Sequence, residues 1–320
     1  MNYVQHVNAC LRTAIERIDE PFVVFGQNLA AGSRIGGLAA GLESGGRRIV
    51  INTPNIDNTQ VGMGFGLMAR GVSSVFMMKQ QDFLLLGIDH LVNTYNVIRM
   101  RRPEASFTIL AIVVDSGWEG PQSCLNNLDD FCSISHVPGF VASNREDVAR
   151  VFDAHMVAPG CRILGVSQRL FKQEVIEPPG PARSDASAEI FSYARGRDAT
   201  VVAFNFAFPQ ALDIHAAAAR AGVSISLFSV NAMLPSTWTP ILDDLQRTRR
   251  LAVVDDSKSA NRASDRLLAE AAAVCELDAI VTERRTYSDS WYRPNADLMT
   301  VDADAVLDRL GILRRARSAG

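Results

Sequence analysis

Residues 48–71 read RIVINTPNIDNTQVGMGFGLMARG, and three structural signals follow one another in this segment. Its first four residues are mostly apolar and β-branched, which predicts a short buried strand. A Thr-Pro pair then forces extended backbone, because proline excludes the helical region for the residue before it. Asp57 predicts the start of a helix as its N-cap residue, and Gln60 follows at the spacing of a capping box.

The predicted helix contains three closely spaced glycines, Gly62, Gly64 and Gly66. Each glycine costs a helix roughly 1 kcal/mol relative to alanine. Three of them so close together indicate that another element packs very near this backbone, in the same chain or across a subunit interface. A strand, a sharp turn and an acidic residue at the start of a close-packed helix make this segment the expected centre of the chemistry.

Predicted strands and helices alternate along the rest of the chain. Such alternation predicts the α/β class, with a parallel sheet covered by helices on both faces. Functional residues in this architecture gather in the loops at the carboxyl ends of the strands. In the first half of the chain, strands are predicted at 22–25, 48–51, 72–77, 107–114, 140–142 and 162–166, and helices at 3–19, 35–42, 88–99 and 145–155.

A segment rich in proline and small polar residues divides the chain. It contains Pro-Pro-Gly-Pro at 178–181 and predicts an exposed linker. We therefore expect an α/β domain over 1–175, a linker over 176–190 and a smaller α/β domain over 191–320. In the second domain, strands are predicted at 199–204, 224–230, 250–255 and 278–282, and helices at 209–221, 240–247 and 261–275.

Composition excludes several classes of protein. The net charge is −3 and no basic block is present, which argues against a nucleic-acid partner. No run reaches the ~20 apolar residues that span a membrane, and the N-terminus lacks the apolar core of a signal peptide. Five cysteines without a CxxC pair argue against disulfides and zinc, and favour a reducing, cytoplasmic location.

Several short motifs occur in the order and spacing of a known family. In the first half these are residues 52–57 (NTPNID), 88–93 (IDHLVN) and 136–140 (HVPGF), and in the second half 231–235 (NAMLP) and 277–281 (LDAIV). Together they resemble the β subunit of the thiamine-diphosphate-dependent 2-oxo acid dehydrogenases, in their decarboxylating component. More distantly, the chain resembles the second half of transketolase. The resemblance implies a pyrimidine-binding α/β domain followed by a transketolase C-terminal-like domain.

The resemblance also implies a partner. In that family the β-type chain supplies the pocket for the aminopyrimidine ring of thiamine diphosphate. The α-type chain holds the diphosphate and Mg²⁺ through a Gly-Asp-Gly motif, which this sequence lacks, so no metal site is expected here. Homodimerisation within a heterotetramer of two α-type and two β-type subunits is implied. A lipoyl domain or carrier protein is a possible acyl acceptor.

Carried over by position, the resemblance places Asn55, Asp57, Phe83 and Lys79 beside the cofactor. Asp57 stands at the family's glutamate, whose carboxyl group hydrogen-bonds the pyrimidine ring, and Phe83 would stack on the ring face. Asp57 is shorter than glutamate by one methylene, ~1.5 Å of reach, and the alternative is that it only caps its helix. Lys79 is suited to hold a carboxylate or phosphate of the substrate, unless it is simply a solvated residue at a strand end.

Two further positions differ from the family pattern or remain open. Ser123 stands at the family's catalytic histidine, and a serine is not a near-neutral acid or base as histidine is. His136 is a weaker candidate for contact with substrate. The sequence therefore predicts a specialised β-type subunit that transfers an acyl or ketol unit from a 2-oxo acid or ketose when paired with an α-type subunit. The alternatives are a non-catalytic or regulatory β-type subunit and a half-length transketolase-type subunit acting on sugar phosphates.

Overall fold

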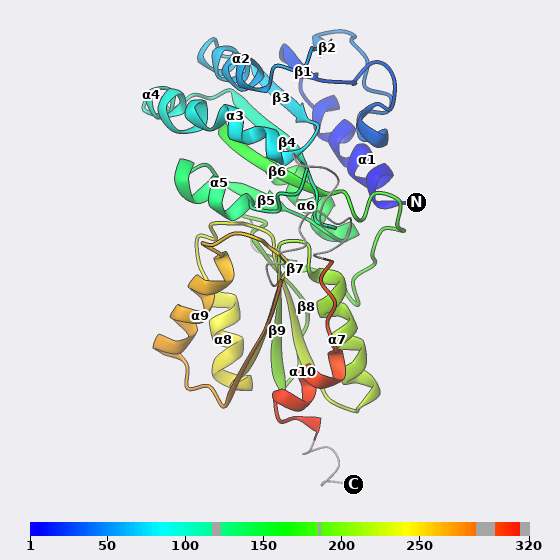
Figure 1. Cartoon of the computed structure of the whole chain (residues 1–320), viewed down its shortest axis with the longest axis vertical. Coiled ribbons are helices and arrows are strands. Elements are labelled where there is room, and N and C mark those ends of the chain that lie inside the picture. Colours follow the sequence, from blue (N-terminus) through cyan, green and yellow to red (C-terminus); the bar gives the residue numbers. More distant parts are fainter. Residues whose placement is uncertain (117–122, 185–186, 286–297, 314–320) are drawn as a thin grey trace.

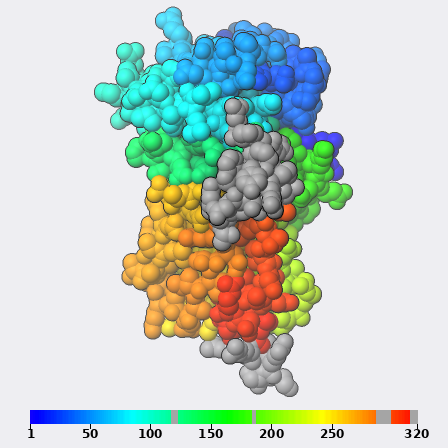
Figure 2. Space-filling model, viewed as in Figure 1, coloured from blue at the N-terminus to red at the C-terminus, as the bar shows by residue number. Residues whose placement is uncertain are grey.

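A computed structural model describes residues 1–116, 123–184, 187–285 and 298–313 (Figure 1). The chain forms two α/β units stacked along its longest axis, each built on a six-stranded sheet. Figure 2 shows the blue-to-green residues of the first unit meeting the yellow-to-red residues of the second. No helix in the described ranges is long and apolar enough to cross a membrane.

The first sheet is parallel throughout, with the order β2-β1-β3-β4-β6-β5. Its strands are β1 (Phe22–Gly26), β2 (Arg48–Asn52), β3 (Ser73–Met78), β4 (Ser106–Val113), β5 (Gly139–Val141) and β6 (Gly160–Ser167). β4, β3 and β6 are almost wholly buried because helices cover both faces of the sheet.

Helices of the first unit divide between the two faces of its sheet. One face carries α1 (Tyr3–Glu16), the short η1 (Ile35–Gly37) and α6 (Arg145–His155). The other carries α2 (Asp57–Ala69), η2 (Gln81–Phe83), α3 (Leu84–Asp89), the π-helical η3 (His90–Thr94), α4 (Tyr95–Arg99) and α5 (Leu128–Ser135). Each face has its own apolar core.

The second sheet is mixed, with the order β12-β11-β9-β10-β8-β7. Its strands are β7 (Arg183–Ser184), β8 (Ile190–Ala194), β9 (Ala199–Phe204), β10 (Ile225–Val230), β11 (Arg250–Asp255) and β12 (Ala279–Arg284), of which β7 and β8 pair antiparallel. Its helices are α7 (Phe208–Arg220), α8 (Thr239–Thr248), α9 (Ala263–Val274) and α10 (Ala303–Arg309). The predicted α/β class is confirmed for both units. The segment predicted as a linker, 176–190, contains β7 and the first residue of β8, and residues 185–186 within it lie outside the described residues.

Several predicted elements differ from the structure. The helix expected at 88–99 is interrupted by the π-helical η3, and the helix expected at 35–42 is only the short η1. Strand β8 and helix α10 were not predicted. The strand at 48–51 exists as β2, but Ile49 and Ile51 are 52% and 39% exposed, because β2 is the edge strand of the sheet.

Helix α2 begins differently from the prediction. Asp57 is its first residue, Ile56 occupies the cap position, and no side chain caps the helix. Gln60 does not complete a capping box, because its amide donates to Thr53 Oγ1 and, at 3.4 Å, to the Pro54 carbonyl. The predicted N-cap role of Asp57 is therefore wrong, which leaves its carboxyl group available for another partner.

The close packing predicted around the glycines of α2 is confirmed at two of the three. A Cβ added at Gly64 would lie 2.1 Å from the Phe107 ring of β4. One added at Gly62 would lie 3.0 Å from Nε2 of His90, whereas one at Gly66 would meet nothing within 4 Å. Gly64 therefore lets α2 lie directly on the sheet, and the close neighbours belong to the same chain.

A buried network of charges joins the two units. Arg169 donates from Nε to Asp115 Oδ2 at 3.1 Å and from Nη2 to Asp256 Oδ2 at 3.3 Å. Arg285 donates to the Asp115 carbonyl at 2.6 Å and to the Asp256 carbonyl at 2.9 Å. Arg169 and Asp115 belong to the first unit, whereas Asp256 and Arg285 belong to the second. The network therefore fixes the position of one unit on the other.

Candidate functional site

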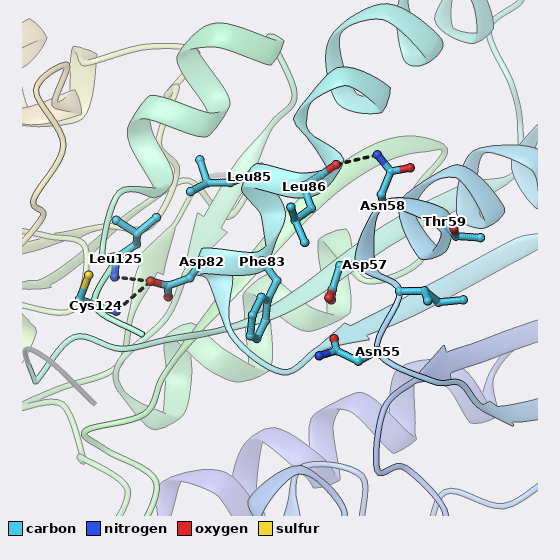
Figure 3. Close-up of a pocket in the computed structure, with 11 residues that line it drawn as sticks. Asn55, Asp57, Asn58, Thr59, Asp82, Phe83, Leu85, Leu86, Cys124 and Leu125 are labelled. Carbon is cyan, nitrogen blue, oxygen red and sulfur yellow. Dashed lines mark hydrogen bonds between the residues drawn. The ribbon is translucent and has the colours of Figure 1, made fainter. Parts of the chain in front are cut away.

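A cavity of about 650 Å³ opens at the carboxyl edge of the first sheet, on the face that carries α2 and α3. It lies where β2 leads into α2 and where β3 leads into η2, as the architecture predicts. We refer to it as the Asp57 cavity (Figure 3). Its lining residues are Asn55, Ile56, Asp57, Asn58, Thr59, Asp82, Phe83, Leu85, Leu86, Cys124 and Leu125.

Asp57 places a carboxyl group inside this cavity. The residue is only 3% exposed, and Figure 3 shows its carboxylate pointing toward the space beside Phe83 and Asn55. Within the described ranges, no other residue donates a hydrogen bond to it. Burial raises the pKa of this carboxyl, and only its own backbone amide acts against that shift. A buried carboxyl group in this position favours a ligand that supplies a hydrogen-bond donor.

Phe83 and Asn55 border the same space. Phe83 ends η2, and its ring faces the cavity opposite Asp57. The side-chain oxygen of Asn55 accepts a hydrogen bond from the side-chain amide of Gln27, which follows β1. An aromatic face and a buried carboxyl group, held on two different loops, suit a planar heterocycle that stacks on one and hydrogen-bonds to the other.

Asp82 fixes the wall of the cavity. Its Oδ1 accepts hydrogen bonds from the backbone amides of Cys124 at 2.8 Å and Leu125 at 3.0 Å (Figure 3). Burial raises the pKa of the Asp82 carboxyl, while these amides lower it. The bonds hold the loop before α5 against η2. Asp82 was not predicted as a site residue, because a contact across some forty residues leaves no local pattern.

Ser123 lies next to this wall but does not line the Asp57 cavity. Its hydroxyl donates to the side-chain oxygen of Gln80 at 2.7 Å. The hydroxyl is therefore engaged with the loop after β3 and does not point at Asp57. Gln80 was not predicted as a site residue, although it connects the two loops that border the cavity.

Lys79 and His136 do not line the Asp57 cavity. Lys79 borders a second cavity, on the opposite face of the sheet. His136 is exposed at the end of α5, with φ of 52°, three residues before β5 begins. It therefore lies at the amino edge of the sheet. The structure brings together Asn55, Asp57 and Phe83 of the predicted site residues.

In sequence, the chain is similar to β subunits of 2-oxo acid dehydrogenases. It is 22% identical over 263 residues to the mitochondrial 2-oxoisovalerate dehydrogenase subunit beta of Chaetomium thermophilum. The aligned residues make up 80% of this chain and 56% of that protein. It is 24% identical over 293 residues to the pyruvate dehydrogenase E1 component subunit beta of Leifsonia xyli subsp. xyli, with coverage of 89% and 82%. No family model matches the chain.

In structure, the chain is similar to transketolases. The inactive beta4 tetramer of a split-gene transketolase superposes with a TM-score of 0.71 at 12% identity, covering 97% of this chain and 98% of that one. Transketolase of Campylobacter jejuni gives a TM-score of 0.67 at 10% identity, covering 99% of this chain and 46% of that one. The resemblance seen in the motifs is confirmed, because the chain is distantly related to the dehydrogenase β subunits and has the fold of the C-terminal half of transketolase.

Proposed function

We propose that this chain is the β-type subunit of a two-subunit, thiamine-diphosphate-dependent enzyme that transfers an acyl or ketol unit from a 2-oxo acid or a ketose. The observation that carries the proposal is the carboxyl group of Asp57, which is buried opposite the ring of Phe83 and accepts a hydrogen bond from no other described residue. The distant relationship to dehydrogenase β subunits supports the same reaction class.

The residues present fit the aminopyrimidine part of that cofactor. The cavity offers a flat apolar face at Phe83, a carboxyl group at Asp57 and an anchored amide at Asn55. Because its pKa is raised by burial, the Asp57 carboxyl suits proton exchange with a ring nitrogen. When bound, the cofactor supplies a nucleophilic carbon for attack on a carbonyl, and the protein supplies orientation and the hydrogen bond.

The chain would form only part of the complete site. Apolar side chains of Ile56, Leu85 and Leu86 are 44%, 58% and 56% exposed around the cavity mouth. Apolar surface beside a cavity of this kind favours cover by a partner. We assign that place to an α-type subunit, which would hold the diphosphate and Mg²⁺. The split-gene transketolase chain of the same fold is likewise inactive as a beta4 tetramer.

Reconstitution tests the proposal. The chain is mixed with an α-type protein that carries the Gly-Asp-Gly motif, thiamine diphosphate and Mg²⁺, and turnover of 2-oxo acids and ketose phosphates is followed. We expect turnover only in the complete mixture. A complex that assembles and binds the cofactor, yet turns over nothing in such a panel, would contradict the enzymatic proposal.

A non-catalytic β-type subunit is the second candidate, and Ser123 favours it. Its hydroxyl is engaged with Gln80, and no histidine lines the described part of the Asp57 cavity. Calorimetric titration of the assembled complex with thiamine diphosphate separates the two candidates. Saturable binding supports the enzyme, and its complete absence supports a structural or regulatory subunit.

A further inference from the structure

A second cavity, of about 610 Å³, opens at the same edge of the first sheet as the Asp57 cavity. It lies on the opposite face, between the start of α1, the segment around η1 and the loops that follow β1, β3 and β6. None of its described lining residues is acidic, although the chain carries a net charge of −3. We refer to it as the lysine cavity.

Lys79 and Lys172 both line this cavity. They are two of only three lysines in a chain whose 32 basic residues are otherwise arginines. Within the described part of the chain, neither forms a hydrogen bond or an ion pair. Both side chains are exposed, and two positive charges on a cavity whose described lining has no acidic residue attract an anion.

Arg169 adds a third cation to the lining but differs from the lysines. Its side chain is only 10% exposed and is paired with Asp115 and Asp256. Its charge is therefore largely compensated by the network between the units. The two lysines are therefore the cations that would bind a ligand, whereas the paired side chain of Arg169 only lines the cavity.

The backbone around the lysine cavity is unusually constrained. Ile35 lines it with φ of 50° and follows Arg34 at 46°, both in the left-handed region. A β-branched residue in that region is a genuine outlier, and such strain concentrates at functional sites. Lys172 is held by backbone bonds on both sides, from Val4 to Phe171 and from Tyr3 to Gln173. The cavity is therefore built on fixed elements.

We propose that the lysine cavity is a binding site for a phosphate or carboxylate group of a small molecule, with Lys79 and Lys172 as its ligands. Polar side chains of Asn28 and Gln80 complete the lining with donors for anionic oxygens. The site does not depend on the proposed function. It lies apart from the Asp57 cavity, and binding is measured on the full chain alone.

The small number of lysines gives a direct test. Reductive methylation with ¹³C-formaldehyde keeps the charge of lysine and yields one dimethyl-lysine signal each for Lys79, Lys172 and Lys258, assigned by single Lys→Arg variants. Inorganic phosphate and malonate are titrated in separate arms at constant ionic strength. We expect the Lys79 and Lys172 signals to shift along one saturating curve while Lys258 stays constant. The arm that saturates at the lower concentration identifies phosphate or carboxylate as the preferred group.

Calorimetry on unmodified protein supplies the second measurement. The double variant Lys79→Gln/Lys172→Gln should weaken binding of the preferred anion by at least about tenfold. Arg70→Gln, at an exposed position away from the cavity, is the control and should leave the affinity unchanged. The proposal would be overturned if Arg70→Gln weakened anion binding as much as the double variant. It would also be overturned if all three lysine signals shifted in parallel, or if neither anion gave a saturating curve.

Discussion

Asp57 and Asp256 are both buried, at 3% and 0% exposure, but the structure surrounds their carboxyl groups differently. Asp256 accepts hydrogen bonds from Asn205 and Phe206, both at 2.9 Å, and pairs with Arg169. Among the described residues, Asp57 accepts none from any other residue. Burial raises both pKa values, that of Asp256 to about 6.

The difference separates two kinds of buried carboxyl group. A buried carboxyl group that the chain surrounds with donors contributes to its structure. One that the chain leaves without donors costs stability and is explained by a ligand that supplies them. In the same way, a ligand explains the two lysines of the lysine cavity, to which the described chain offers no anionic partner. Substitutions at these positions can therefore separate function from stability.

The largest expected effect is on activity, at Asp57. In the complete complex, Asp57→Asn should lower turnover by roughly 10²–10⁴-fold, because the carboxyl group that exchanges a proton is lost. The free energy of unfolding should stay equal or rise, since a desolvated carboxyl without partners is removed. Turnover assays and urea unfolding measure the two effects. Asp57→Glu, which keeps the carboxyl group, should retain activity. Full activity in Asp57→Asn would show that turnover does not need the Asp57 carboxyl group.

At Asp256 the expected effect is on stability. Asp256→Ala should lower the free energy of unfolding by about 3–5 kcal/mol, because Arg169 and Arg285 stay buried while the carboxylate that lies 3.3 and 4.0 Å from them is removed. Urea unfolding of the full chain measures it. The matched control is Asp153→Ala, which removes an exposed ion pair with Arg17 and should cost less than about 1 kcal/mol. A similar small loss at Asp256 would show that the network contributes little.

The position of Asp57 depends in turn on how α2 lies on the sheet. Gly64→Ala should cost about 1–3 kcal/mol of unfolding free energy, because its Cβ would overlap the buried Phe107 ring. Gly66→Ala is the control in the same helix, where a Cβ meets nothing within 4 Å. It should stabilise the chain by up to about 1 kcal/mol, the helix preference for alanine. Equal effects of the two substitutions would mean that close packing does not decide the position of α2.

Local sequence patterns predicted the α/β alternation and the strand–turn–helix at 48–71, because hydrophobic period and turn residues are local properties. The edge position of β2 was missed, since an apolar run is the same in an edge strand and in a central one. The cap role of Asp57 was wrong because an acid at the first helical position gives nearly the same pattern as one at the N-cap.

Contacts between distant residues explain what the sequence did not predict at the site. The resemblance placed Asp57 and Phe83 together, and the structure agrees. Lys79 was expected beside them, but the side of the sheet to which a loop turns depends on packing and not on neighbouring residues. The pairing of Arg169 with Asp256 joins segments almost ninety residues apart, for which no motif exists.

The prediction that depends on pH concerns Asp129, a second acid between the two units. It accepts hydrogen bonds from Ser257 Oγ at 2.9 Å and the Ala263 amide at 3.1 Å. Burial, and then the charge of neighbouring Asp255, raise its pKa from 3.8 to about 7. Between these values the folded chain binds more protons than the unfolded chain, so this carboxyl lowers the free energy of unfolding as the pH rises.

Asp129→Asn keeps the shape and an acceptor but removes this titration. Relative to the unchanged chain, its free energy of unfolding should therefore rise with pH across that window, by at most about 1.4 kcal/mol per pH unit. Urea unfolding at a series of pH values measures the difference, in which the other titrating groups cancel. Asp153→Asn, at an exposed position, should follow the unchanged chain. If the free energies of unfolding of Asp129→Asn and the unchanged chain depend on pH in the same way, Asp129 is ionised in the folded chain across this window. The hydrogen bonds to its carboxyl would then lower its pKa more than burial raises it.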